Sequence, residues 1–242
     1  MRGNVIFAKN NMLDIVYQDE HLIAINKPHG LLVHRSPIAN DAKEFALQLL
    51  RDQVNRYVSP VHRLDRKTGG LLLFTFEKEV EIAMHKQFQE GLVKKKYKAV
   101  VRGYSPESMD IDYPLVKENG MIQDAFTSFV TLKQAELDIS LGKHPTSRYS
   151  LVEATPTTGR MHQLRKHFAH IFYPIIGDRK HGCNKQNKFF KEQWEMTTML
   201  LHASELSFVH PVTKQELHLT ATLQDEFKRV MELMKWELSD ND

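Results

Sequence analysis

The stretch HRLDRKTGGLLLFTF, residues 62–76, places a charged segment directly before a run of mostly apolar side chains. The run Leu71–Phe76 has the length of a strand buried in a sheet, and Gly69 and Gly70 before it are typical of a tight turn. The stretch therefore predicts a buried strand that begins beside a cluster of charged residues.

The pattern on either side of this strand alternates short strands with a few helices. Further strands are expected over Ile15–Tyr17, Leu22–Asn26, Lys96–Arg102, Tyr149–Ala154, His202–Val209 and Glu216–Ala221. Helices are expected over Ala42–Arg56, Glu77–Glu90, Met161–Phe172 and Leu223–Trp236. The mixed segment Lys117–Leu141 predicts a hairpin or loop that could touch a substrate. This order favours an α+β domain on a mixed or antiparallel sheet over a doubly wound parallel one.

The composition is that of an ordinary globular protein. The chain has 242 residues, 41% hydrophobic and 26% charged, enough to bury at least one core. Its apolar runs are far shorter than the ~20 residues that cross a bilayer, and its N-terminus lacks the apolar core of a secretory signal. We expect a cytoplasmic protein with no membrane association. Residues 12–242 are expected to form a single domain, with residues 1–11 as an extension outside the fold.

Cysteine and charge narrow the possible partners. A single cysteine, Cys183, excludes an intramolecular disulfide and leaves too few thiolates for a zinc knuckle. The net charge of +3 is a weak indication of a polyanionic partner, and its clustering is more informative. The clusters are Arg63, Arg66 and Lys67; Lys94, Lys95, Lys96, Lys98 and Arg102; Arg160, Arg165 and Lys166; and Arg179 with Lys180. Several separate solvated faces would give the same pattern.

Asp65 is the first candidate for chemistry. It lies between Arg63 and Arg66, and nearby cations keep a carboxylate ionised, which suits a nucleophile better than a proton donor. The structural alternative is that Asp65 only caps the turn that follows it. Asp178, which also has a basic flank, is a rival carboxylate.

Two further segments join cations to residues that bind anions or bases. In Gly159–Arg165 a turn leads into a helix, so Arg160 and Arg165 could form an anion site, for a phosphate or a buried carboxylate. Arg165 could instead form a surface pair of little energetic value. Tyr97 stands among lysines at the start of a strand, an arrangement that combines phosphate attraction with base stacking; a tyrosine packed against a neighbouring strand is the simpler alternative.

Metal and nucleotide-hydrolase chemistry find little support. His162, His167 and His170 are spaced by five and three residues, which does not place all three on one helical face, and no cysteine completes a ligand set. A glycine-rich phosphate loop and a Gly-x-Ser-x-Gly elbow are both absent from the sequence.

Six segments, in order over about residues 15–220, together resemble the RluA-type pseudouridine synthases. They are NKPHGLLVH at 26–34, HRLDRKTGGLL at 62–72, KKYKAVVRG at 95–103, TGRMHQLR at 158–165, PIIGD at 174–178 and LHA at 201–203. Within this family, LVHRS at 32–36, YPLV at 113–116 and GDRKHG at 177–182 look most similar to a branch that acts on tRNA.

The resemblance implies a fold, a reaction and a set of site residues. The fold would be α+β, with a central mixed, mainly antiparallel sheet, flanking helices and an active-site cleft. Asp65 would be the catalytic aspartate, Tyr97 would stack on the base, and Arg165 would hold the aspartate ionised. Leu164 would form an apolar wall beside the uracil. Arg63 would enter the RNA where the target nucleotide has flipped out. The reaction would need no cofactor and no metal.

The expected partner is RNA, in particular tRNA with a target uridine in the T-stem region, and no obligate protein partner is evident. Isomerisation of a uridine in ribosomal RNA, RNA binding without catalysis, and hydrolytic cleavage of RNA remain as alternatives. The combination of Asp65, Tyr97 and Arg165 argues against pure binding, because binding alone does not need a carboxylate facing a polyanion.

Overall fold

The computed structural model describes residues 12–35 and 44–237, and the chain divides into two compact units. The first unit comprises residues 1–93 and 206–221, and the second comprises residues 94–205 and 222–242. The expected extension at residues 1–11 lies outside the described residues. No helix in the described part of the chain is both long enough and apolar enough to span a membrane.

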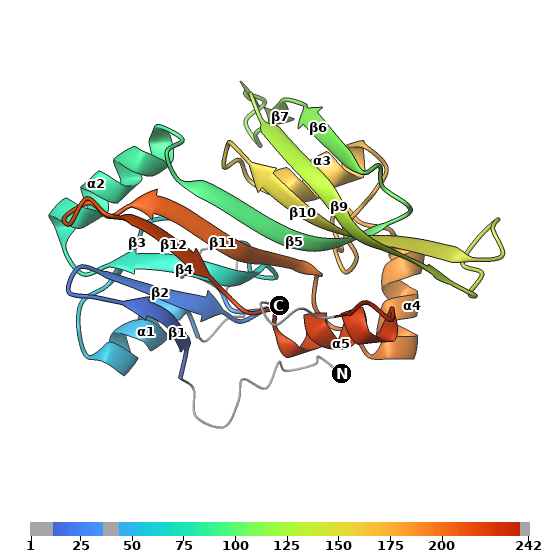
Figure 1. The fold of residues 1–242 in the computed structure, drawn as a ribbon, viewed down its shortest axis with the longest axis horizontal. Helices are drawn as coiled ribbons and strands as arrows, with labels where there is room; N and C mark the ends of the chain where they lie inside the picture. Colours follow the sequence, from blue (N-terminus) through green and yellow to red (C-terminus); the bar gives the residue numbers. More distant parts are fainter. Residues whose placement is uncertain (1–11, 36–43, 238–242) are drawn as a thin grey trace. The chain divides into compact units, whose positions relative to one another are not determined.

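The first unit is built around two buried strands, β2 and β4 (Figure 1). Its strands are β1 (Asp14–Gln18), β2 (Leu22–Lys27), β3 (Ser59–Pro60), β4 (Gly69–Thr75) and β12 (Glu216–Thr220), with helices α1 (Ala46–Val54) and α2 (Lys78–Gln89). Strand β2 pairs antiparallel with β1 and with β4, from Leu22 opposite Thr75 to Lys27 opposite Gly70. All residues of β2 and β4 are buried, which explains their continuous apolar character.

One apolar cluster holds this unit together. Leu71 and Leu73 of β4 pack with Val80 and Met84 of α2, so the helix covers one face of the strands. Residues from the distant segment 206–221 complete the same cluster, and strand β12 lies in contact with β1 although about 200 residues separate them. The N-terminal part of the chain therefore does not enclose its own core.

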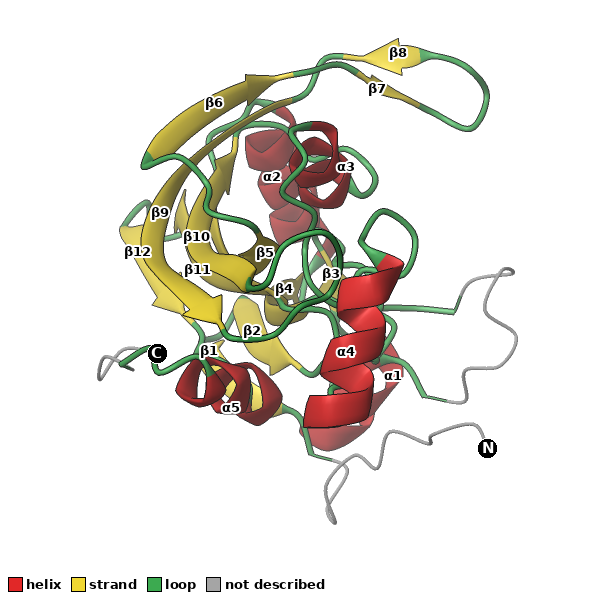
Figure 2. Cartoon of the chain, turned by 90° about the vertical axis from the view of Figure 1, so that its right-hand side faces the viewer, coloured by secondary structure: helices red, strands yellow, loops and turns green. Residues whose placement is uncertain are grey.

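The second unit is a curved antiparallel sheet in the order β5-β10-β9-β6. Its strands are β5 (Lys94–Arg102), β6 (Ser108–Asp112), β9 (Phe126–Leu137) and β10 (Ser147–Pro156). Strands β7 (Leu115–Val116) and β8 (Ile122–Gln123) form a separate hairpin, which extends beyond the end of β6 and β9 (Figure 2). Strand β11 (Leu201–Val209) starts in this unit and ends in the first.

The helices of the second unit pack in two places. Helix α3 (Gln163–His170) places Phe168 against Phe129 of β9, with their rings 5.1 Å apart. Helices α4 (Asn184–Trp194) and α5 (Asp225–Leu233) share another cluster, which contains Phe190, Phe227 and the buried Tyr149.

The sequence-based expectations for the elements largely agree with the structure. The α+β class and the mainly antiparallel sheet are confirmed, and each expected helix and strand is present with bounds shifted by a few residues. Helix α1 was expected over Ala42–Arg56, and in the structure it extends from Ala46 to Val54.

One expectation needed correction, and two elements were missed. The segment Lys117–Leu141, expected as a hairpin or loop, holds half of the β7–β8 hairpin and then the long strand β9. Strand β6 and helix α4 were not expected at all. The second half of β9 alternates only between exposed and half-buried positions, and α4 buries few of its residues, so neither carries a strong apolar period.

Candidate active site

Asp65 lies in a turn that leads directly into β4. The backbone N–H of Thr68 donates to the Asp65 carbonyl oxygen at 3.0 Å, and the strand begins at Gly69. Gly70 has a φ of +103°, a conformation that glycine adopts at little cost. The side chain of Asp65 is half-buried, while that of the neighbouring Arg63 is exposed. The expected position of Asp65, beside the start of a buried strand, is confirmed.

The loop after β2 fixes this turn from the other side. The Gly30 N–H donates to the carbonyl oxygen of Arg66 at 2.8 Å, and Arg66 Nε donates back to the Gly30 carbonyl oxygen at 3.0 Å. Gly30 has a φ of +86°, which favours glycine. The imidazole Nδ1 of His29 lies 2.7 Å from the Lys67 carbonyl oxygen. Three hydrogen bonds therefore connect the two segments across the Asp65 turn.

Lys27 forms the centre of this connection. Its side chain is fully buried at the end of β2, and Nζ donates to the carbonyl oxygens of Pro28 (3.1 Å), Leu31 (2.9 Å) and Arg66 (3.4 Å). Burial lowers the pKa of Lys27 to about 7, against the negative charge of Asp65, which raises it. The Lys27 ammonium thus links the loop after β2 to the backbone of the Asp65 turn.

His29 is the second buried titratable group beside this turn. Burial lowers its pKa to about 4, although the hydrogen bond to the Lys67 carbonyl acts in the opposite direction. Our reading of the sequence assigned no role to His29 or to Lys27. A lysine at the end of the mostly apolar strand LIAINK was the available signal, because a buried lysine needs partners.

Tyr97 and Leu164 belong to one apolar cluster of the second unit. Leu164 on α3 is a buried member, and Tyr97, opposite Ala154 in the β5–β10 pairing, packs against its edge. Tyr97 is half-buried, so part of its ring is accessible. The structure therefore brings together the two residues expected to contact a base.

Arg165, on the same helix, is joined to Asp178. Its Nε donates to Asp178 Oδ2 and its Nη2 to Oδ1, both at 2.8 Å. The backbone N–H groups of Lys180 and His181 also donate to Oδ1, at 2.9 and 3.1 Å. Burial raises the pKa of Asp178. The hydrogen bonds from Arg165 and from the His181 backbone lower it by more than burial raises it, so the pKa lies below its ordinary value.

Helix α4 anchors the Asp178 loop. Asn187 accepts a hydrogen bond from the Gly177 N–H at 2.8 Å and donates to the Asp178 carbonyl oxygen at 2.7 Å. Gly182 allows close approach of this backbone, since a Cβ there would lie 2.1 Å from the Asp178 carbonyl oxygen. The partner of Arg165 is thus fixed by an element that sequence patterns did not predict.

Gln163 organises the turn before α3. Its side chain is buried and bonds to the Thr158 hydroxyl (2.7 Å), the Arg160 N–H (3.0 Å), the Phe126 carbonyl oxygen (2.9 Å) and the Thr127 hydroxyl (3.0 Å). This amide holds the loop 157–160 onto the start of β9. Its role was also missed, and its place in the Gly159–Arg165 segment was the only signal.

The three histidines near α3 have different partners. His162 Nδ1 lies 3.1 Å from His181 Nε2, whereas His167 contacts the Thr127 hydroxyl and the Tyr113 carbonyl oxygen. His170 stacks on the ring of Tyr113, with 3.6 Å between centroids. Over residues 12–35 and 44–237, no cluster of three or more histidine, cysteine or acidic side chains has the arrangement of a metal site.

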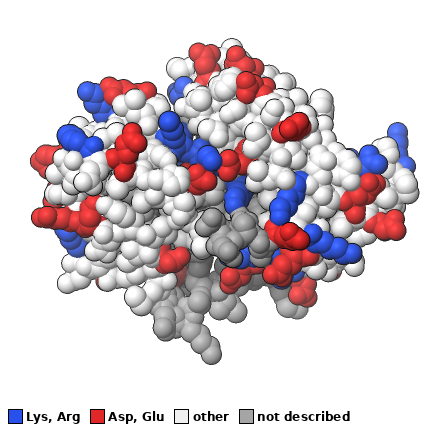
Figure 3. Space-filling model, viewed as in Figure 1, with Lys and Arg blue, Asp and Glu red and all other residues white. Residues whose placement is uncertain are grey.

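The lysines around Tyr97 do not act as one cationic patch. Lys96 Nζ pairs with Glu153 at 3.0 Å and with Glu205 at 3.4 Å, which neutralises it. Lys95 is partly buried, and its Nζ lies 3.5 Å from the Thr158 carbonyl oxygen. On the face drawn in Figure 3, basic and acidic side chains are interspersed. The clustering read from sequence therefore overstates the local positive charge at Lys96.

The site residues fall into the two units. Asp65 and Arg63 lie in the first, and Tyr97, Leu164 and Arg165 lie in the second. The expected pairing of Arg165 with Asp65 stays a prediction, and so do the roles of Arg63, Tyr97 and Leu164 toward RNA.

Comparison with known families identifies the class of protein. Residues 21–170 match the family of RNA pseudouridylate synthases, and this span contains both the Asp65 turn and the Gly159–Arg165 segment. The chain belongs to this family, as the six sequence segments predicted.

Individual relatives are similar over nearly their full length. The tRNA pseudouridine synthase C of Vibrio parahaemolyticus is 43% identical over 93% of this chain and 96% of its own. That of Haemophilus influenzae is 42% identical over 93% of this chain and 99% of its own. Among solved structures, human RNA pseudouridylate synthase domain containing 4 is 25% identical with a TM-score of 0.70, and covers 94% of this chain and 95% of its own.

Proposed function

We propose that this protein converts a specific uridine of tRNA to pseudouridine, with Asp65 as the catalytic carboxylate. The observation that carries the proposal is the similarity, at 43% identity over nearly the whole chain, to proteins named tRNA pseudouridine synthase C. The turn that holds Asp65 supports the assignment of the carboxylate, because buried Lys27 and the loop after β2 fix its backbone.

The reaction suits the residues present. The N1–C1′ bond of uridine breaks, the uracil turns, and a bond forms between C5 and C1′, while C5 loses a proton and N1 gains one. No electrons are gained or lost overall, so the isomerisation needs a positioned carboxylate and a closed apolar site rather than a redox group. Asp65 adds to uracil C6 or acts at the ribose, and both routes use the ionised carboxylate.

The remaining residues bind the base and the strand. The target uridine has to leave its stack before chemistry, which costs a few kcal/mol. Tyr97 stacks on the uracil, Leu164 forms the apolar wall beside it, and Arg165 pairs with Asp65. Arg63, whose side chain is exposed, occupies the space that the flipped nucleotide leaves. Together these contacts offset the cost of flipping. We expect the reaction in the cytoplasm.

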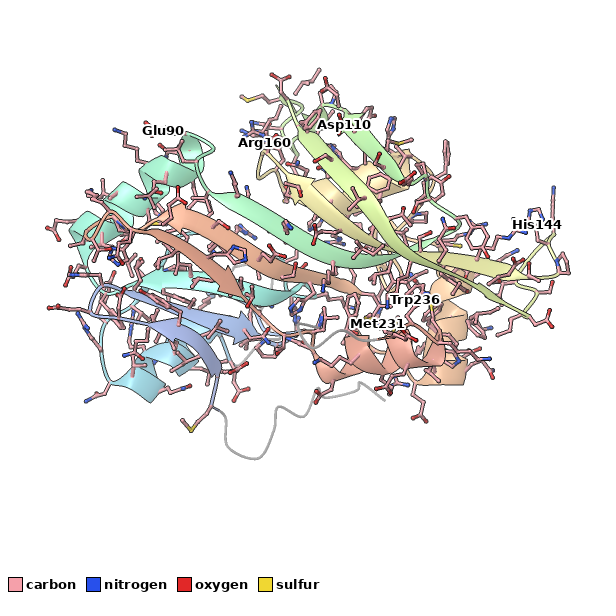
Figure 4. The ribbon with its side chains drawn as sticks, in the orientation of Figure 1. Glu90, Asp110, His144, Arg160, Met231 and Trp236 are labelled. Carbon is pink, nitrogen blue, oxygen red and sulfur yellow. The ribbon has the colours of Figure 1, made fainter. Side chains whose placement is uncertain are left out.

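A tritium-release assay tests the reaction. The substrate is tRNA carrying tritium at uracil C5, and EDTA is present throughout, so the assay also tests the expectation that no metal takes part. Wild type releases tritium, whereas Asp65→Asn and Asp65→Ala release none and bind the tRNA with nearly unchanged affinity. Asp110→Asn, an exposed aspartate on β6 (Figure 4), is the matched control and keeps full turnover.

The same assay decides between the alternatives. Tight binding by wild type with no tritium release would favour an RNA-binding protein, and strand cleavage would favour a nuclease. Pseudouridine mapping of total RNA from a deletion strain, with plasmid rescue, tests the substrate. We expect loss at a T-stem uridine of tRNA; loss confined to ribosomal RNA would refute the tRNA assignment and leave the reaction intact.

A further inference from the structure

A pocket opens in the second unit between the β7–β8 hairpin and the segment that leads into α3. Leu115, Val116 and Lys117 line it from the hairpin, and Arg160, Met161 and Lys166 from the other side; Figure 4 labels Arg160 on the loop after β10. Its volume is about 360 Å³, within the range of ~300–1,000 Å³ that is usual for small-molecule sites. None of the residues assigned to the reaction lines this pocket.

Two hydrogen bonds tether the hairpin to this wall. Lys166 Nζ donates to the Val116 carbonyl oxygen at 3.4 Å, and Arg160 Nε donates to the Asp124 carbonyl oxygen at 3.0 Å. Each bond engages a single N–H of its cation, so further donors remain for a ligand. The hairpin itself is closed by the Lys117 N–H, which donates to the Met121 carbonyl oxygen at 2.8 Å. The pocket is therefore formed before any ligand binds.

The side chains that line this pocket carry more positive than negative charge. In the part of the chain that the structure describes, Lys117, Arg160 and Lys166 form no ion pair with a carboxylate, unlike Lys96 and Arg165. Three uncompensated cations on one pocket, with Glu118 as its single acid, favour an anionic ligand.

The same pocket also carries accessible apolar surface. Leu115 is buried at its base, while Val116 is 55% and Met161 is 45% exposed. Apolar surface beside cations matches the two parts of a nucleotide, the flat face of a base and its phosphate. The amide of Gln123, which also lines the pocket, can bond to the edge of a base.

We propose that this pocket binds one unpaired nucleotide of the substrate RNA, distinct from the target uridine. This inference rests on the proposed function, because it takes tRNA as the substrate. A base inside a helix is stacked on both faces, so only an unpaired nucleotide can place its face against Val116 and Met161. Lys117, Arg160 and Lys166 bind the adjacent phosphates, and occupancy selects RNAs that present such a nucleotide.

Kinetics and salt dependence test the cations. In the full-length protein, the double variant Lys117→Gln with Lys166→Gln should raise KM for tRNA about tenfold and leave kcat within about twofold, since these residues bind substrate and do not touch the reacting atoms. The slope of log Kd against log salt should fall by about 1.4, roughly 0.7 for each lost contact with a single strand. Lys185→Gln with Lys188→Gln, two exposed lysines on α4, is the control and should change neither.

An abasic scan of the tRNA tests the apolar part. Removal of one particular unpaired base should weaken binding to wild type about tenfold, as expected when one aliphatic side chain loses its cover. The Met161→Ala variant should bind intact tRNA more weakly than wild type does. Its affinity should not change further when that base is removed. Identical abasic profiles for wild type and Met161→Ala, or an unchanged KM in the lysine variant, would refute the proposal that this pocket binds a nucleotide. If wild type itself released no tritium from tRNA, the proposed function would fail instead.

Discussion

Arg165 and Asp178 form a two-pronged ion pair, with both hydrogen bonds 2.8 Å long and the Asp178 side chain 1% exposed. Two backbone N–H groups of the following residues share the same carboxylate. A carboxylate engaged in this way is poorly suited to attack a substrate. Asp178, the rival to Asp65 on sequence grounds, is therefore assigned as a positioning residue for Arg165.

Asp178→Asn should destabilise the protein by about 3 kcal/mol, because it leaves Arg165 without its buried counter-charge. Turnover should fall but remain measurable, since the reacting carboxylate is intact. Urea unfolding and the tritium assay measure the two effects. Asp65→Asn should give no turnover, while the Arg165–Asp178 pair stays intact. If Asp178→Asn abolished turnover without loss of stability, Asp178 would itself be catalytic.

Arg165→Ala should reduce turnover severely, and Arg165→Lys should restore only part of it, because an ammonium cannot reproduce the fork of two parallel bonds. Steady-state kinetics with tRNA separate the effects on kcat and KM. Arg148→Ala, an exposed arginine on β10, is the control. Wild-type kcat with a raised KM in Arg165→Ala would assign this arginine to RNA binding.

Tyr97→Ala should weaken substrate binding by about 1–3 kcal/mol, the usual contribution of one stacked base, whereas Tyr97→Phe should bind like wild type. Loss of turnover in Tyr97→Phe alone would show that the hydroxyl moves a proton. Tyr57→Ala, a surface tyrosine of the first unit, serves as the control. Equal affinity of wild type and Tyr97→Ala would remove Tyr97 from the base site.

His29 should make the stability depend on pH in the acid range. Its pKa is about 4 in the folded state and 6.5 ordinarily, so between these values the unfolded chain binds the proton and the folded chain does not. The contribution of His29 to the free energy of unfolding should therefore rise with pH from about 4 to 6.5 and stay level above.

His29→Gln can keep the bond to the Lys67 carbonyl without titrating, so it isolates this effect. Relative to this variant, wild type should lose up to about 3 kcal/mol between pH 6.5 and 4. Chemical denaturation at a series of pH values measures the difference. Parallel pH profiles for the two proteins would exclude His29 as the titrating group.

The parts of the fold that sequence predicted are those that local pattern determines. The apolar run after Gly70 predicted a buried strand, and the helical spacing of apolar residues over Glu77–Glu90 predicted a helix. The structure has both elements. Helix α4 and the second half of β9 depend on tertiary partners, and their polar faces hide the period.

The same distinction applies to the site. Asp65 became a candidate through its charged neighbours in the chain, and the family resemblance implied its catalytic role, which stays a prediction. Lys27 bonds to the carbonyl oxygen of Arg66, 39 residues later, and Asn187 bonds to Gly177 and Asp178, ten and nine residues earlier, so these links depend on the folded chain. Asp178 looked like a second nucleophile because its partner, Arg165, lies thirteen residues earlier in the sequence.

The division of the first unit into residues 1–93 and 206–221 bears on its synthesis. Leu206, Phe208 and Leu219 belong to the core that also contains Leu22 and Leu71. As the ribosome releases the chain from its N-terminus, the first ninety or so residues leave the exit tunnel long before these partners exist. Their buried strands must wait, apolar and incompletely covered, while the intervening domain is made, so nascent chains stalled before residue 206 are the species that most need a chaperone.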